Sequence, residues 1–238
     1  MLTRTRIAVL CSQRAPGLAY LLAQSRLPGA AFDVVCCLTS ADSLSDAPLL
    51  DSYGVPLITH PVRAFYAAHA PGCRLSDRDV RMAYDRESAV RLTAYRPDVI
   101  VLAGYLLLLT SPMLTAYAGR IINVHHSDLQ RRDAGGAPRY KGLRAVRDAI
   151  LAGERETRST AHLVTMTLDD GPLLARSEPY PVPAVAQWAR EAGERDVLKS
   201  AIWAHQEWML RTAFGPLMVR AIELVAAGLL CEFLEPAS

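Results

Sequence analysis

Two short apolar runs in the middle of the chain constrain its fold more than any other feature. The first covers residues 98–105 (DVIVLAGY) and the second covers residues 120–127 (RIINVHHS). Both are β-rich and show little polar alternation, a pattern typical of strands that are covered on both faces. The second run ends in Asn123 and His125, and residues two apart on a strand point to the same face. Because ligands bind at the carboxyl ends of the strands in an open parallel sheet, both side chains are candidates for a functional site.

Strand-like and helix-like segments alternate along the chain around these runs. The other expected strands cover residues 6–11, 32–38, 56–59, 159–165 and 173–177. The expected helices cover residues 17–24, 49–53, 77–95, 111–117 and 143–152 and most of the chain beyond residue 178, with breaks at Gly193 and Gly215. Residues 61–77 fit no regular element, and residues 128–142 form a long polar loop of the kind that often covers a site. This order predicts the α/β class, with a Rossmann-like, mostly parallel sheet flanked by helices and a helical C-terminal tail.

The chain of 238 residues, 51% of them apolar, is long enough for one sizeable core. We expect a single domain with an N-terminal Rossmann-like lobe (1–96), a second lobe that carries the functional residues (97–183) and a helical tail (184–238). The tail contains an unusually apolar stretch at residues 221–230. Because exposed apolar patches tend to be interfaces, this stretch favours a homodimer.

Charge and cysteine usage exclude several classes of protein. The net charge of +2 argues against a nucleic-acid partner or a membrane-surface partner. No apolar stretch reaches the roughly 20 residues that a membrane span requires, and the apolar run near the N-terminus is too short for a signal peptide. The five cysteines are odd in number and form no Cys-x-x-Cys pair, which favours ordinary thiols over disulfides or a metal site. We therefore expect a cytoplasmic protein.

Residues 168–172 (LDDGP) are the second informative motif. Two acids followed by Gly-Pro indicate a turn between strands, and taken alone the motif predicts no more than that. A carboxylate against an imidazole, however, orients the ring and raises its pKa, and a nearby amide can hold a developing oxyanion. An Asn, a His and an Asp together suit acyl-type transfer through a tetrahedral intermediate. No Ser or Cys nucleophile is required when the acceptor is an amine.

The combination of Asn-x-His at residues 123–125, after a Leu-Ala-Gly-Tyr strand, with the later Asp-x-Gly-Pro resembles the folate-dependent formyltransferase family. The members that this chain resembles include glycinamide ribonucleotide transformylases, formyltetrahydrofolate deformylases and methionyl-tRNA formyltransferases. The resemblance implies the formyltransferase fold, 10-formyltetrahydrofolate as the formyl donor, and no metal. It also implies a catalytic trio in which His125 shuttles a proton, Asn123 binds the oxyanion, and Asp169 keeps His125 positioned and basic.

The resemblance further implies residues that bind the donor and the acceptor. The donor's pteridine would be held by the segment Tyr105, Leu106, Leu107, Leu108 and Leu109 and by the turn that carries Thr165, Leu168 and Asp170. The acceptor side would include Ser12, Gln13, Arg14 and Glu207.

One departure from the family concerns the loop after the first strand. The transformylases carry a glycine-rich loop there, whose backbone amides cradle the substrate phosphate. This chain has Ser12-Gln13-Arg14-Ala15-Pro16-Gly17 instead, so the glycines are lost and the proline removes one amide donor. We therefore expect a small-molecule amine acceptor other than glycinamide ribonucleotide.

Two alternative functions stay open. The runs His125-His126-Ser127 and Ser159-Thr160-Ala161-His162 resemble the deformylase branch, which hydrolyses 10-formyltetrahydrofolate to formate and tetrahydrofolate. A non-catalytic folate-binding protein on the same fold is the third reading, and the intact trio argues against it. We expect His126 to serve packing or loop orientation and His162 to have its polar atoms satisfied in or near the core.

Overall fold

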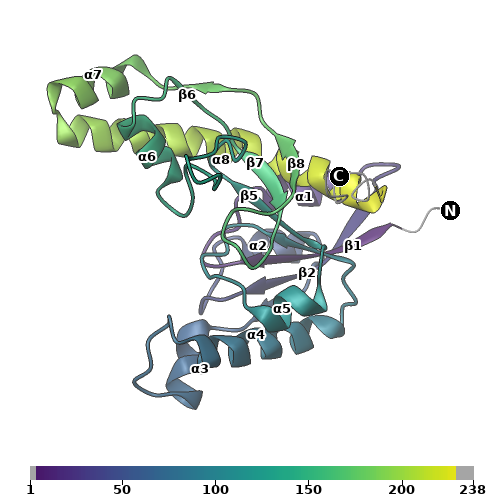
Figure 1. The fold of residues 1–238 in the computed structure, drawn as a ribbon. Helices are drawn as coiled ribbons and strands as arrows, with labels where there is room; N and C mark the ends of the chain where they lie inside the picture. The colour runs from purple at the N-terminus through teal and green to yellow at the C-terminus, as the bar shows by residue number, and fades with distance from the viewer. Residues whose placement is uncertain (1–3, 229–238) are drawn as a thin grey trace, which may run out of the picture.

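Seven strands form the central sheet of the protein, in the order β3-β2-β1-β4-β5-β7-β8 (Figure 1). The computed structural model describes residues 4–228. The strands are β1 (Thr5–Cys11), β2 (Phe32–Thr39), β3 (Leu57–Thr59), β4 (Val99–Leu102), β5 (Ile121–His125), β7 (Thr160–Leu163) and β8 (Leu173–Arg176). The pairs from β3 to β5 are parallel, and β7 and β8 join in antiparallel pairing. This arrangement confirms the predicted α/β class and the mostly parallel sheet.

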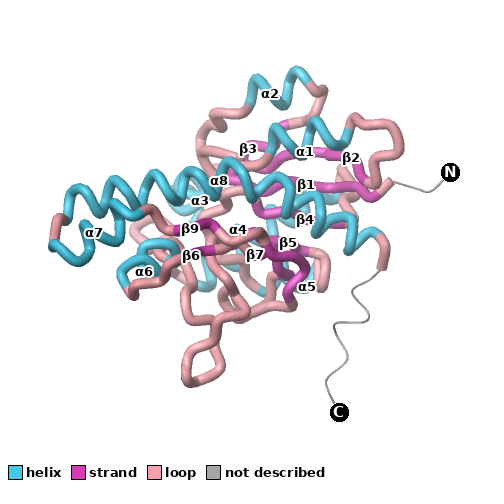
Figure 2. The backbone as a smooth tube through the Cα atoms, turned by 90° about the horizontal axis from the view of Figure 1, so that it is seen from above, coloured by secondary structure: helices cyan, strands magenta, loops and turns pink. Residues whose placement is uncertain are grey.

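Two apolar layers cover the two faces of the sheet, because successive residues of each buried strand point to opposite sides. On one face, Ile7 and Val9 of β1 pack with side chains from α1 (Leu18–Ser25), α2 (Ala47–Ser52) and α8 (Arg195–Ala226). On the other face, Ala8 and Leu10 pack with side chains from α4 (Arg78–Thr93) and α5 (Ser111–Ala116). Figures 1 and 2 show α8 running along the sheet on the side opposite α4.

A smaller cluster extends the structure beyond the end of the sheet. It joins α6 (Ala145–Leu151), α7 (Ala184–Ala192) and the first half of α8 through Val146, Ile150, Val182, Ala186 and Met209. A two-stranded ribbon lies beside it, formed by β6 (Glu156–Thr157) and β9 (Tyr180–Pro181) in antiparallel pairing. The sequence pattern did not indicate these strands, because two residues are too few to show a period.

Two sequence-based expectations about regular elements are wrong. Residues 61–77 are not irregular throughout, because α3 spans Val62–His69 and buries Val62, Phe65 and Tyr66. Gly215 does not break a helix, because α8 runs through it and through Pro216. A Cβ atom at Gly215 would lie 2.6 Å from Cβ of Tyr20, so the glycine permits α1 and α8 to approach closely. Gly193, by contrast, ends α7 as expected, in the left-handed conformation that favours glycine.

Other expectations fall partly outside residues 4–228. Cys11, Cys36, Cys37 and Cys73 are free thiols as expected, whereas Cys231 lies outside the described residues. The apolar stretch 221–230 ends in two residues that are also outside them, and the homodimer stays a prediction. The division into lobes at residue 96 likewise stays a prediction. Among the described helices, none has the length and apolarity that crossing a membrane requires.

The strand order places a switch point between β1 and β4, since the chain leaves β1 toward one edge of the sheet and leaves β4 toward the other. Loops that follow neighbouring strands in opposite directions leave a crevice at the carboxyl ends of those strands. The loops after β1 and β4 carry residues 12–14 and 105–109, and β5 ends in Asn123 and His125.

Candidate active site

Asn123 and His125 lie at the carboxyl end of β5, and the turn between β7 and β8 brings Asp169 beside them. The distance from Nδ1 of His125 to Oδ2 of Asp169 is 3.5 Å, and both side chains are buried. The same carboxylate oxygen accepts a hydrogen bond of 2.7 Å from the backbone N–H of Gly142. Asp169 has a φ of 52°, a conformation that Asp tolerates better than most residues. The structure therefore brings the predicted trio into one small region.

Gly171 explains why the turn has this shape. A Cβ atom at this position would lie 1.8 Å from the carbonyl oxygen of Leu163, so no side chain fits. The backbone N–H of Leu163 donates to the carbonyl of Pro172 at 2.9 Å, which joins the two sides of the turn. The Gly-Pro pair thus holds the turn tightly against β7, and this turn places Asp169 in the site.

The environment of His125 lowers its pKa rather than raising it. Burial of the imidazole is the largest influence and lowers the pKa below its ordinary value of 6.5, although Asp169 and the carbonyl of Tyr140 act in the opposite direction. Asp169 thus acts on the pKa of His125 in the expected direction, but burial outweighs its effect. The reason is desolvation, which disfavours the charged form and is invisible in a sequence pattern.

Both ring nitrogens of His125 nevertheless face oxygen acceptors. Nδ1 faces the Asp169 carboxylate, and Nε2 lies 3.3 Å from the carbonyl oxygen of Tyr140. A neutral imidazole carries one N–H and can donate to one of these acceptors, whereas the protonated ring donates to both. The neutral ring is thus favoured by burial, and a proton gained during a reaction finds both acceptors already in place.

His162 adds a fourth polar side chain to the trio. Its Nε2 accepts a hydrogen bond of 3.2 Å from Nδ2 of Asn123, and its Nδ1–H donates to the carbonyl of Leu163 at 2.9 Å. The ring is 2% exposed, which confirms the expectation that its polar atoms are satisfied near the core. The sequence did not link it to Asn123, although Asn123 and His162 are direct cross-strand partners in the β5–β7 register. His162 thus fixes the amide, whose second N–H stays available for a ligand.

The segments predicted to bind the donor expose large apolar side chains. Leu106 and Leu108 are 62% and 66% exposed, and Met166 and Leu168 in the β7–β8 turn are 64% and 44% exposed. Thr165 is exposed beside them, while Tyr105, Leu107, Leu109 and Asp170 are partly buried. Aliphatic side chains in such positions are typical of a surface that a flat, largely apolar ligand covers.

Three of the four residues predicted to bind the acceptor already contact other parts of the protein through their side chains. The Ser12 hydroxyl is buried, lies 2.9 Å from the Ser40 hydroxyl and accepts a 3.2 Å hydrogen bond from the backbone N–H of Leu106. Arg14 is exposed and lies 3.6 Å from the Glu207 carboxylate of α8, and Gln13 is exposed. The structure thus places Arg14 and Glu207 together, whereas Ser12 joins the acceptor loop to the donor segment.

A carboxylate of the protein itself already accepts from one backbone N–H of this loop. Oδ2 of Asp46 accepts a hydrogen bond of 2.9 Å from the backbone N–H of Ala15. Gly17, at the start of α1, lies against α8, where an added Cβ atom would be 3.1 Å from the backbone nitrogen of Gly215. The sequence could not reveal this contact, since Asp46 follows β2 and lies far from Ala15 along the chain.

The long loop at residues 128–142 lies over the trio. The carbonyl of Tyr140 faces His125, and Arg132 forms an ion pair with Asp170, the neighbour of Asp169. The loop therefore contacts both the catalytic candidates and the turn of the donor side. Its expected role as a mobile cover stays a prediction.

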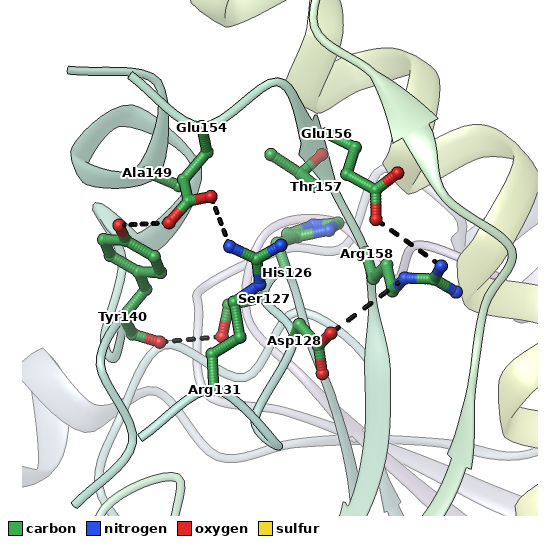
Figure 3. A pocket seen from close by; sticks show the side chains of 10 residues that line it. All are labelled: His126, Ser127, Asp128, Arg131, Tyr140, Ala149, Glu154, Glu156, Thr157 and Arg158. Atoms are coloured by element: carbon green, nitrogen blue, oxygen red, sulfur yellow. Dashed lines mark hydrogen bonds and ion pairs between the residues drawn. The ribbon is translucent and has the colours of Figure 1, made fainter. Parts of the chain in front are cut away.

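A pocket beside this loop is lined by residues that include His126, Asp128, Arg131 and Arg158 (Figure 3). The β5 residues that alternate with the two catalytic candidates, Ile122 and Val124, belong to the α8 layer, and His126 continues that side by packing on Phe214 with ring centroids 4.4 Å apart. Burial lowers the pKa of His126 to about 3.

The charged side chains of this pocket neutralise one another, because Arg131 pairs with Glu154, and Arg158 pairs with Asp128 and Glu156. His126, which packs on Phe214, has the expected packing role. In residues 4–228, no group of three or more His, Cys, Asp or Glu side chains is arranged to hold a metal ion.

The chain is similar to several known proteins in sequence and in fold. The chain is 39% identical over 100 residues to the phosphoribosylglycinamide formyltransferase of Escherichia coli K12. This match covers 42% of this chain and 43% of that protein. It is 26% identical over 207 residues to the formyltetrahydrofolate deformylase of the same organism, covering 84% of this chain and 64% of that protein. The chain thus spans less than two thirds of the length of either relative.

Among solved structures, glycinamide ribonucleotide transformylase 1 from Symbiobacterium toebii aligns with a TM-score of 0.69 and 28% identity, covering 94% of this chain and 89% of that chain. A formyltetrahydrofolate deformylase from Burkholderia mallei shares the fold, with a TM-score of 0.59 and 22% identity over 86% of this chain and 64% of that chain. The sequence profile of the formyl transferase family matches residues 5–195, so the chain belongs to the formyl transferase family.

Proposed function

We propose that the protein transfers the formyl group of 10-formyltetrahydrofolate to the amine of a small acceptor that is not glycinamide ribonucleotide. The observation that supports this most directly is the convergence of Asn123, His125 and Asp169 beside a surface of exposed Leu and Met side chains. That surface suits the pteridine of a folate, and the trio suits an acyl-type transfer.

In the proposed reaction, the amine nitrogen attacks the formyl carbon and forms a carbon–nitrogen bond. The carbonyl oxygen becomes an oxyanion, which accepts a hydrogen bond from the second N–H of the Asn123 amide. His125 takes the proton that the amine loses and returns it to the folate nitrogen, directly or through a water molecule, as the old carbon–nitrogen bond breaks. Asp169 accepts from the Nδ1–H of the ring throughout. Nε2 exchanges the proton with the reacting groups, so its contact with the Tyr140 carbonyl must open for each transfer.

The acceptor loop supports an acceptor without a phosphate. Pro16 offers no backbone N–H, and the N–H of Ala15 already donates to Asp46. The Arg14 guanidinium is paired with Glu207. A phosphate at this loop would have to displace one carboxylate and approach another, which like charges oppose.

The test is incubation of the purified protein with 10-formyltetrahydrofolate, with and without a panel of small amines. Tetrahydrofolate is followed by absorbance, and formate and formylated amines are followed by mass spectrometry. We expect tetrahydrofolate to appear together with a formylated amine, and the His125→Ala variant to lose this turnover while still binding tetrahydrofolate. Turnover that persists in His125→Ala would remove His125 from the mechanism.

Hydrolysis of the same donor is the second candidate, since the match to the E. coli deformylase extends over 84% of this chain and the run His125-His126-Ser127 resembles the deformylase branch. Water would then replace the amine as the attacking group, and formate would be released. Rapid formate release without any amine, abolished in His125→Ala, would favour this reading over the transferase. A protein that binds tetrahydrofolate with no turnover under either condition would be a folate-binding protein without catalysis.

A further inference from the structure

A buried ion pair on α4 contacts residues 105–110, which are called the donor segment below. Neither member of the pair is among the residues that the sequence singled out. Asp85 is fully buried, and its Oδ1 lies 3.3 Å from Nη2 of Arg81, one helical turn earlier. The Arg81 side chain is also buried, and its guanidinium lies over the ring of Tyr84, 5.0 Å from the centroid. Removing two charges from water is costly, and a buried ion pair is often no more stable than apolar residues of the same size. Stability alone is therefore a weak reason for this pair.

Both members of the pair contact the ends of the donor segment. The second carboxylate oxygen of Asp85 accepts from the backbone N–H and from the hydroxyl of Thr110, at 2.6 Å and 2.7 Å. Nη2 of Arg81 donates to the hydroxyl of Tyr105 at 3.3 Å. The two residues that bound the apolar segment are thus tied to the same turn of α4.

The contacts of the segment alternate between inward and outward positions. Leu107 packs inward against the apolar cluster of α3 and α4. Leu106 and Leu108 point outward and are exposed, and the N–H of Leu106 donates to Ser12. Residues 105–110 therefore have a fixed backbone path while two of their leucines stay available to a ligand.

We propose that Asp85, supported by Arg81, is a positioning residue for the formyl donor. It holds residues 105–110 in the shape that presents their backbone groups and the outward leucines to the folate. This inference rests on the proposed function. Because a preformed binding segment avoids the entropy cost of ordering on binding, loosening the ties should weaken donor binding.

The sharpest test uses two substitutions at Thr110. Thr110→Val has nearly the same shape but loses the hydroxyl that donates to Asp85, whereas Thr110→Ser keeps it. Asp85→Asn removes the charge, and Asp79→Asn, an exposed residue earlier on the same helix, is the matched control. For each variant, the Kd for tetrahydrofolate is measured by calorimetry, and the donor KM and kcat are measured by the turnover assay, together with the melting temperature.

We expect Thr110→Val to raise the Kd for tetrahydrofolate by about tenfold, since a hydrogen bond to a charged group is lost, with kcat at saturating donor changed by less than about twofold. Asp85→Asn should raise the Kd further, and Thr110→Ser and Asp79→Asn should match the wild type. If Thr110→Val lowers the melting temperature but leaves the Kd and the donor KM unchanged, Asp85 is structural and the inference is wrong. If the wild-type protein itself does not bind tetrahydrofolate, the proposed function fails first, a result that is separate from any effect of the variants.

Discussion

The donor side and the acceptor side of the site both depend on a carboxylate that accepts from loop backbone, yet they present opposite surfaces to a ligand. On the donor side, Asp85 is fully buried with Arg81, and the segment above it leaves Leu106 and Leu108 exposed. On the acceptor side, Asp46 is half-buried and takes the N–H of Ala15. The Asp85 carboxylate holds a segment whose leucines stay exposed. The Asp46 carboxylate instead accepts from a backbone N–H that a ligand could otherwise use.

Under the proposed function, this difference would separate a donor surface shared within the family from an acceptor loop particular to this chain. A donor common to a family can be recognised by one apolar surface and by backbone groups, which tolerate changes of side chain. Acceptors differ between relatives, and here the polar groups of the acceptor loop already bond within the protein. The four predictions below test whether the two sides act independently, beginning with the change that should affect turnover most.

The largest effect is expected for Asp169→Asn, at the boundary between the two sides. Asn also tolerates the left-handed backbone at this position, so the turn should keep its shape. The variant loses the charge that stabilises protonated His125, and we expect kcat to fall by about 100-fold, as is typical when acid–base catalysis is impaired. The measurement is kcat at saturating donor, alongside the Kd for tetrahydrofolate, which should change little. An unchanged kcat would exclude the carboxylate from proton transfer.

The next effect concerns the turn that completes the donor side. Gly171→Ala places a Cβ atom against the Leu163 carbonyl, and the backbone must move to avoid it. We expect the free energy of unfolding to fall by about 3 kcal/mol, with a weaker affinity for tetrahydrofolate. Urea denaturation measures the first quantity and calorimetry the second. Gly135→Ala is the control, since its Cβ would meet its nearest neighbour at 3.4 Å. Equal losses of stability in both variants would contradict the steric explanation.

A third prediction compares one buried histidine beneath each side. Burial lowers the pKa of His60, next to α4, to about 4, and lowers that of His126, next to α8, to about 3. Since the unfolded chain titrates near 6.5, it binds more protons than the folded protein once the pH drops below that value, and stability falls with acid. At pH 5, each of these two histidines should lower the free energy of unfolding by about 2 kcal/mol relative to neutral pH.

Urea denaturation at pH 7.5 and pH 5.0 checks this prediction. His60→Gln and His126→Gln should each reduce the difference between the two pH values by a similar amount. A wild-type stability that is equal at both pH values would show that these rings are not held neutral by the fold.

The sequence predicted those features that local patterns encode. The buried strands appear as unbroken apolar runs, and Asn123, His125 and Asp169 lie in short motifs whose spacing along the chain is informative. By contrast, Asp85, Asp46 and His162 acquire their roles from contacts across 25, 31 and 39 residues. The lowered pKa of His125 and the continuity of α8 through Gly215 depend in the same way on neighbours that fold against them. A single sequence carries no direct record of such contacts.

The smallest effect tests the acceptor side alone. Asp46→Ala leaves the N–H of Ala15 without its acceptor and removes one negative charge from the loop. We expect the free energy of unfolding to fall by about 1 kcal/mol, the usual scale for one lost hydrogen bond. Inorganic phosphate should inhibit turnover more strongly than in the wild type, because the freed amide and Arg14 can then meet an anion. Asp42→Ala, an exposed residue in the same connection, is the matched control. Calorimetry should show a Kd for tetrahydrofolate within about twofold of the wild type, since the side-chain hydrogen bond of Asp46 goes to Ala15 and not to residues 105–110. A weakening of donor binding as large as that in Thr110→Val would show that Ser12 couples the two loops, and that acceptor choice and donor affinity cannot change separately.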